Sequence, residues 1–172
     1  MWFALRKESL DFIRTAPVLH VCAAAVAAPR AVVFGAFADA ANWSRWFPNV
    51  RVASYTSAPP HGVGSIRGAR VGGTRWSEEM IAWDVDARLA WTVTRTSVPF
   101  AVAQVESFEF TDATNGTEVR WTLAIAPRLV ARLGGPFTQR AMTRMLHRAT
   151  RNLEAYLQQI DGDSRQGKEQ AR

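Results

Sequence analysis

Cysteine is almost absent from this 172-residue sequence, since Cys22 is the only one. A single cysteine excludes an internal disulfide and most cysteine-based metal sites, so the chain does not depend on an oxidising compartment. Long hydrophobic runs are also missing. The apolar stretch at 16–28 is interrupted by His20, follows the acidic Glu8 and Asp11, and is too short to span a bilayer. We therefore expect a cytoplasmic protein.

The usual signatures of metal and cofactor chemistry are lacking as well. The three histidines are scattered and have no zinc-site spacing. The glycines of Gly62-Val63-Gly64 precede a predicted strand, whereas a dinucleotide-binding fingerprint requires a helix there. No Gly-x-Ser-x-Gly nucleophile elbow occurs. The sequence thus predicts neither a metal nor a cofactor.

Positive charge is in excess, with a formal net charge of +6. Arg140, Arg144, Arg148 and Arg151 recur along one side of a predicted C-terminal helix, and cations are common on the wet face of amphipathic helices. Aromatic residues do not interleave with them, so a nucleic-acid platform would lack its stacking surface. We expect no nucleic-acid partner, and contact of this basic face with a membrane surface or another protein is an alternative function.

Tryptophan, in contrast, is abundant, with seven residues in a chain of which 48% is hydrophobic. Each indole is a large rigid surface that needs burial or a partner. A chain of this length forms one domain of ordinary size. The aromatic supply suits a dense core or an aromatic-lined cavity.

Hydrophobic periodicity and turn residues divide the chain into elements. Residues 1–14 show a pattern loosely consistent with a short helix, within an N-terminal arm (1–16) that we expect on the outside of the domain. The main domain (17–160) begins with a strand at 18–26, followed by two short helices that start at Pro29 and Asp39 and end before Pro48. Further strands are predicted at 50–55, 65–71, 74–83, 88–96, 101–111 and 117–126, with a strong hairpin signal at Asn115-Gly116. A long helix follows at 136–160, and 161–172 is predicted to be a disordered tail.

This order predicts an α+β fold with a curved antiparallel sheet of about seven strands. The only element long enough to cover the sheet is the final helix. A strongly curved sheet cannot touch a straight helix everywhere, so a cavity should form between them. We expect a small ligand to bind in that cavity.

Four sequence blocks carry a resemblance to a known family. They are Asn42-Trp43-Ser44-Arg45-Trp46-Phe47-Pro48-Asn49-Val50, Gly62-Val63-Gly64-Ser65-Ile66-Arg67, Trp76-Ser77-Glu78-Glu79-Met80-Ile81 and Gly116-Thr117-Glu118-Val119-Arg120-Trp121. In this order they resemble the START-like, or Bet v 1-like, helix-grip superfamily (SRPBCC), and within it the polyketide cyclase/dehydrase and lipid-transport branch, over about residues 18–158. The resemblance implies a helix-grip fold around a hydrophobic ligand. In ring-closing members, interior arginines and hydroxyl-bearing residues move protons on a poly-β-ketone.

Strand alternation predicts which side chains face the interior. Trp121 faces inward in the last strand, and Phe108 and Phe110 face inward in the strand before it, which also brings in Glu106 and Gln104. Trp91 shares its inward face with Arg95, so Arg95 and Glu106 could pair across neighbouring strands, or lie near strand ends and contribute little. The spacing from Trp83 slightly favours Glu79 over Glu78 as the inward carboxylate, and either Arg67 or Arg70 faces inward.

The predicted ligand contacts are large apolar side chains of the sheet, the second short helix and the final helix. They are Trp46, Trp91, Phe108, Phe110, Trp121, Met142, Met145 and Ala149. The main hypothesis is binding, or transport, of a small hydrophobic ligand such as a lipid or polyketide-like compound. The alternative is a polyketide cyclase, aromatase or dehydrase with the catalytic candidates Arg67, Glu79, Arg95 and Glu106.

Overall fold

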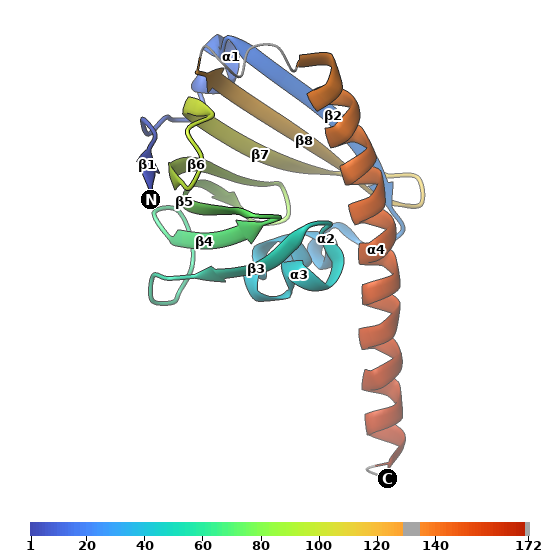
Figure 1. The fold of residues 1–172 in the computed structure, drawn as a ribbon. Helices are drawn as coiled ribbons and strands as arrows, with labels where there is room; N and C mark the ends of the chain where they lie inside the picture. Colours follow the sequence, from blue (N-terminus) through green and yellow to red (C-terminus); the bar gives the residue numbers. More distant parts are fainter. Residues whose placement is uncertain (129–134, 171–172) are drawn as a thin grey trace.

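The computed structural model of the chain describes residues 1–128 and 135–170, and of 135–137 and 161–170 only the backbone. One curved antiparallel sheet, with strand order β2-β8-β7-β6-β5-β4-β3, faces the long helix α4 (Figure 1). The strands are β1 (Phe3–Ala4), β2 (Val18–Val26), β3 (Val50–Tyr55), β4 (Ile66–Val71), β5 (Thr74–Asp84), β6 (Arg88–Thr96), β7 (Ala101–Ala113) and β8 (Gly116–Pro127). The helices are α1 (Phe12–Thr15), α2 (Arg30–Ala38), the 3-10 turn η1 (Ala40–Asn42), α3 (Trp43–Trp46) and α4 (Gly135–Gln170). The predicted α+β helix-grip architecture is confirmed.

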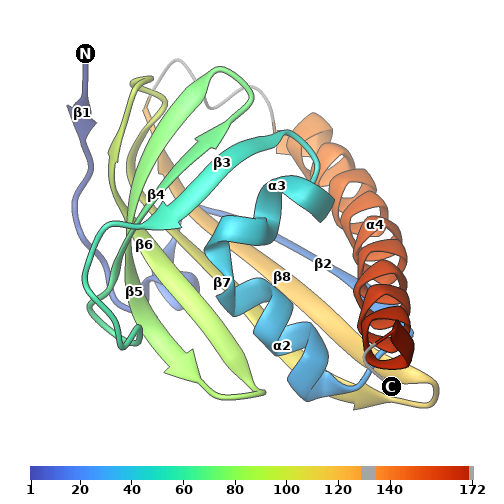
Figure 2. The same ribbon diagram turned by 90° about the horizontal axis from the view of Figure 1, so that it is seen from below.

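The segment between β2 and β3 connects the two opposite edges of the sheet. β2 pairs with β8, the last strand, and β3 forms the opposite edge. Between them α2, η1 and α3 lie across the open side of the curved sheet, next to α4 (Figure 2). The concave face is therefore covered by α2 and α3 at one end and by α4 along its length.

The β7–β8 hairpin turns at Gly116, as its Asn-Gly signal predicts. Gly116 has a φ of 143°, which side-chain-bearing residues rarely adopt. A Cβ at this position would also collide with the Val26 carbonyl oxygen of β2. The hairpin and the β2 pairing therefore both require a glycine here.

Helix α2 fixes the densest part of the core. Phe34 and Phe37 are buried on its inner side, and the Phe37 ring lies 4.9 Å from the Phe108 ring and 5.1 Å from the Phe110 ring. Trp46 of α3 packs on Phe37 at 4.8 Å between ring centres. This end of the sheet is thus filled by aromatic rings in mutual contact.

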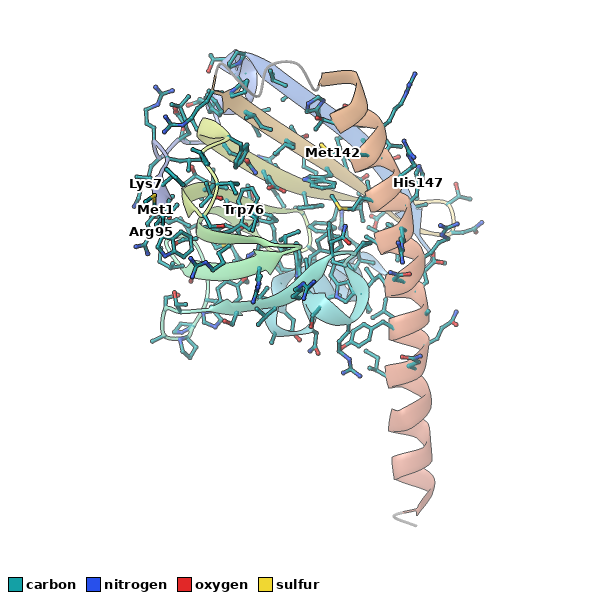
Figure 3. The ribbon with its side chains drawn as sticks, in the orientation of Figure 1. Met1, Lys7, Trp76, Arg95, Met142 and His147 are labelled. Carbon is teal, nitrogen blue, oxygen red and sulfur yellow. The ribbon has the colours of Figure 1, made fainter. Side chains whose placement is uncertain are left out.

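Helix α4 packs on the sheet through one side. Met142, Leu146, Ala149 and Leu153 are buried on it, and Figure 3 shows Met142 on the sheet side of the helix and His147 pointing away. The arginine face defined above is exposed, as predicted. Contact of that face with a membrane or a protein stays a prediction. No helix in the described part of the chain is long and apolar enough to cross a bilayer.

The end of α4 differs from the sequence prediction. The helix continues to Gln170 instead of ending at Ile160, so the predicted disordered tail is helical over 161–170. Proline is absent after Pro136. No residue of this segment therefore sterically prevents α4, which begins where it packs on the sheet, from continuing. Residues 171–172 lie outside the described residues.

The N-terminal arm lies between β6 and β7 where these two strands separate. The pairing of β6 with β7 ends at Thr92, and beyond it the arm lies between the two strands. Leu5 N donates to Thr94 O at 2.9 Å, and Arg6 N donates to Val102 O at 2.8 Å. The arm is therefore a short strand with a single helical turn at Phe12–Thr15, not the helix expected for 1–14, because the backbone groups of the splayed strands need partners.

Candidate functional site

A cavity of about 460 Å³ lies between the concave face of the sheet and the first turns of α4. Most of its wall is aromatic or aliphatic, with six aromatic side chains, namely Trp43, Phe47, Trp76, Trp91, Phe100 and Trp121. Met142 and Met145 close it from α4. A volume of this size, with few polar groups in an apolar wall, is typical of small-molecule sites.

The cavity is lined by Trp43 of α3 and by Phe47 directly after it, together with strands of the sheet and α4. Four of the predicted ligand contacts line it, namely Trp91, Trp121, Met142 and Met145. The other four, Trp46, Phe108, Phe110 and Ala149, belong to the packed core and are almost fully buried. The Phe37 ring fills the space that Phe108 and Phe110 face. These two side chains therefore pack in the core and do not line the cavity.

A buried ion pair forms one part of the cavity wall. Arg67 Nε donates to Glu78 Oε2 at 2.7 Å, and the two side chains are only 3% and 6% exposed. The Arg67 guanidinium carbon lies 4.0 Å from the centre of the Trp91 ring and 4.5 Å from that of Trp43, so the cation is held between two indoles. Arg67 is thus the inward arginine of β4, and Arg70 is exposed.

Glu106 is the second carboxylate in the wall. Its Oε1 accepts a hydrogen bond from Gln104 Nε2 at 2.7 Å, and its Oε2 accepts one from Trp121 Nε1 at 3.1 Å. Burial, and after it the nearby Glu78 carboxylate, raise the pKa of Glu106 to about 7, although Arg67 and the two hydrogen bonds act in the opposite direction. This carboxyl therefore changes its protonation state near neutral pH.

Strand register places His20 in the same row as Glu106. Glu106 is paired with Leu123, and Leu123 is paired with His20, so the two polar residues flank one leucine on the concave face. Gln139 Nε2 of α4 donates to Val21 O at 2.7 Å, which leaves its Oε1 to accept from His20 Nδ1 at 3.2 Å. In the neutral imidazole, Nε2 of His20 is then an acceptor.

Several buried polar atoms of the wall have no hydrogen-bond partner among the described residues. They are the indole Nε1 atoms of Trp76 and Trp91 and the amide Oε1 of Gln104. Buried polar groups in proteins are usually paired. Two of these unpaired atoms belong to side chains that contact Arg67 and Glu106, namely Trp91 and Gln104.

The preference for Glu79 as the inward carboxylate of β5 was wrong. Glu78 faces the cavity, and Glu79 forms an ion pair with Lys7 of the N-terminal arm on the other side of the sheet. The register between β5 and β6 skips Ile81, so a bulge separates Trp83 from Met80. One extra residue reverses which side chains face inward, and the alternation counted from Trp83 then selects the wrong glutamate.

A second bulge moves Arg95 to the outside. The register passes from Glu78↔Val93 to Ser77↔Arg95, so Thr94 is the extra residue on β6. Arg95 is exposed, with its guanidinium 5.5 Å from the ring centre of Trp2, and like Lys7 it lies on the side of the molecule away from α4 (Figure 3). The predicted pairing of Arg95 with Glu106 is therefore absent, and Arg67 supplies the interior cation.

Several residues of the cavity wall were not predicted as ligand contacts from the sequence. Trp43, Phe47 and Trp76 carried a signal, since aromatic residues were expected in the core or the cavity. His20 was seen only as an isolated histidine, because its position opposite Leu123 depends on the pairing of β2 with β8. Gln104 was predicted to face inward, which the structure confirms, but not as a partner of Glu106.

Two other chemistries find no support in the described residues. They contain no group of three His, Cys, Asp or Glu side chains placed to hold a metal ion. Cys22 is buried, and burial raises the pKa of its thiol to about 11, which disfavours the nucleophilic thiolate.

Comparison with known proteins gives a family match and a consistent fold. The family described as "Polyketide cyclase / dehydrase and lipid transport" matches residues 22–158. Uncharacterised proteins of Mycobacterium bovis and Mycobacterium tuberculosis are each 28% identical over 161 residues, which cover 90% of this chain and 93% of theirs.

Solved structures share the fold at low sequence identity. A START superfamily protein from Mycobacterium smegmatis superposes with a TM-score of 0.67 at 14% identity, covering 83% of this chain and 98% of that one. The ginseng major latex-like protein 151 from Panax ginseng has a TM-score of 0.66 at 16% identity, covering 80% and 95%.

Proposed function

The chain belongs to the polyketide cyclase/dehydrase and lipid-transport family, and from that premise we propose that it binds a small hydrophobic molecule in the cavity between the sheet and α4. The observation that carries the proposal is the cavity of about 460 Å³, whose wall is mostly aromatic and aliphatic. Burial of apolar ligand surface there supplies roughly 25 cal/mol per Å² before the costs of binding. The polar groups around Arg67 and Glu106 would orient the ligand.

Uptake of an uncharged fluorescent probe tests this function. N-phenyl-1-naphthylamine should increase its emission on binding, and a native ligand from a lipid extract should displace it. In the variant Ala69→Phe, the new ring occupies the cavity and should weaken probe binding at least about tenfold, because Ala69 is part of the wall. Ala25→Phe, at an exposed position of β2, is the matched control and should bind as the original protein does. Failure of the folded protein to take up the probe or any apolar compound would contradict the proposal.

A second candidate function is acid–base catalysis on a bound keto compound, as in a cyclase or dehydrase. It is favoured by one specific observation, the pKa of Glu106 near 7 inside the cavity, beside the Arg67 cation. A carboxyl titrating near neutral pH can both accept and return a proton. The protein should then accelerate exchange of the α-hydrogens of 2-decanone with D₂O, measured by NMR, and Glu106→Gln should abolish the acceleration. No acceleration by the original protein would leave ligand binding as the function.

A further inference from the structure

The charges that the described residues place around the cavity do not balance. Arg67 contributes one positive charge, while Glu78 and Glu106 contribute two carboxyl groups. The 2.7 Å contact with Glu78 already neutralises the Arg67 cation, and its guanidinium is enclosed between two indole rings. Glu106 is left with neutral hydrogen-bond donors as its direct partners.

We propose that the cavity selects uncharged amphiphiles whose polar end is a hydroxyl group hydrogen-bonded to Glu106, and that it discriminates against carboxylates such as fatty acids. This inference rests on the proposed ligand-binding function and names the chemical class of its ligand.

Glu106 is the polar group best placed to meet a ligand. Arg67, Glu78, Gln104 and His20 all line the cavity but are between 2% and 7% exposed. Glu106 is half-buried and is thus more exposed than these four side chains, and it faces the cavity from the middle of the sheet. Each of its two oxygens accepts one protein hydrogen bond, and a carboxylate oxygen has room for a second donor.

A carboxylate head group would bring a third carboxyl to a region in which Arg67 is the single cation among the described residues. Arg67 is already paired with Glu78. The ligand carboxylate and ionised Glu106 would therefore be two negative charges close together in a poorly solvated site. Binding would then require a proton on Glu106 or on the ligand. A hydroxyl group avoids this cost, because it donates to ionised Glu106 and accepts from protonated Glu106.

An ammonium head group fits less well than a hydroxyl. The faces of Trp43 and Trp91, which could hold a cation, are already occupied by the Arg67 guanidinium. An ammonium also has three donors to satisfy. Among the described residues the wall offers Glu106, the unpaired Oε1 of Gln104 beside it and, two strands away in the same row, His20 Nε2 as acceptors. Two strands correspond to roughly 10 Å between backbones, so an ammonium bound at Glu106 and Gln104 does not also reach His20 and keeps one of its three donors unpaired.

The test compares ligands that share one hydrocarbon chain and differ in the head group. Binding of 1-decanol, decanoate and decylammonium is measured at pH 8 by displacement of N-phenyl-1-naphthylamine. We expect 1-decanol to bind at least about tenfold more tightly than decanoate. Decanoate binding requires a proton on Glu106, and protonating a carboxyl with a pKa of about 7 at pH 8 lowers the apparent affinity about tenfold. Decylammonium should also bind more weakly than 1-decanol.

Glu106→Gln identifies the residue responsible. The variant removes the charge and keeps the shape, so the ratio of decanol to decanoate affinity should fall about tenfold. Glu79→Gln, on the opposite face of the same sheet, is the matched control and should leave the ratio unchanged. Thermal melting and uptake of the neutral probe establish that each variant is folded with an open cavity.

The outcomes separate the two proposals. If decanoate or decylammonium binds as tightly as 1-decanol, or if Glu106→Gln does not change the ratio, the head-group inference is wrong while the binding function stands. If neither the probe nor any of the three compounds binds, the proposed function itself fails.

Discussion

Arg67 and Trp91 are in direct contact, with the guanidinium carbon 4.0 Å from the centre of the indole ring. Trp91 is in turn paired in register with Glu106. The indole therefore lies between the buried cation and the carboxyl that faces the cavity. This arrangement keeps the cation close enough to influence the pKa of Glu106, while its Nε–H is bonded to Glu78.

Removal of the Arg67 cation should strongly destabilise the fold. Arg67→Met leaves Glu78 buried without a counter-ion, and breaking a buried ion pair from one side costs about 3–5 kcal/mol. The double variant with Glu78→Gln should recover part of this loss. Arg88→Met breaks the half-exposed pair with Glu109 and should cost under about 1 kcal/mol. Urea denaturation measures all three, and equal losses for Arg67→Met and Arg88→Met would contradict the assignment.

Stability should fall with rising pH because of Glu106. Its pKa is raised from 4.5 to about 7, so between these pH values the folded state holds a proton that the unfolded state has released. The free energy of unfolding should decrease over this window by up to about 3 kcal/mol and level off above it. Glu106→Gln lacks this proton and should lose the dependence. Urea titrations of the variant and the original protein at pH 5 and pH 8 test this prediction. If their free energies of unfolding differ by the same amount at both pH values, the prediction is wrong.

Gly116→Ala should destabilise the protein by about 2 kcal/mol or more. The substitution puts a Cβ against the Val26 carbonyl at a φ of 143°, so β2 and the β7–β8 turn must both shift. Gly73→Ala is the control, since a Cβ there meets nothing within 4 Å. Thermal melting of the two variants distinguishes them, and a similar melting temperature for both would show that the close approach is not limiting.

The packing of the N-terminal arm behind the cavity wall should depend on Leu5. This side chain is buried between Val93 and Ala101, next to the cavity residues Trp76 and Phe100. Leu5→Ala should cost about 2–4 kcal/mol and accelerate release of a bound neutral probe, because the wall behind the cavity loosens. Leu19→Ala, at a position that is 48% exposed, should change stability by less than about 0.5 kcal/mol. Stopped-flow dilution measures the release rate, and an unchanged rate would show that the packing of Leu5 does not influence ligand release.

The candidate site was predictable only in part. Alternation correctly placed Trp91, Trp121 and Glu106 on the inner face, because β6 alternates regularly up to Val93 and the pairing of β7 with β8 is regular beside the other two residues. The same rule failed at Glu79 and Arg95, where Ile81 and Thr94 are extra residues. A bulge is a response to sheet curvature and to the partner strand, and a single strand does not reveal it.

The sequence by itself determined the order of the elements, the α+β class, the hairpin at Gly116 and the amphipathic sides of α4, since these follow from local backbone preference and hydrophobic period. The tertiary structure decided where the cavity lies and which charges meet in it. Phe37 filled the space facing Phe108 and Phe110, and Arg67 rather than Arg95 supplied the interior cation. Both outcomes depend on strand register and on side chains from distant segments competing for one volume, and neither is encoded in any local stretch of the chain.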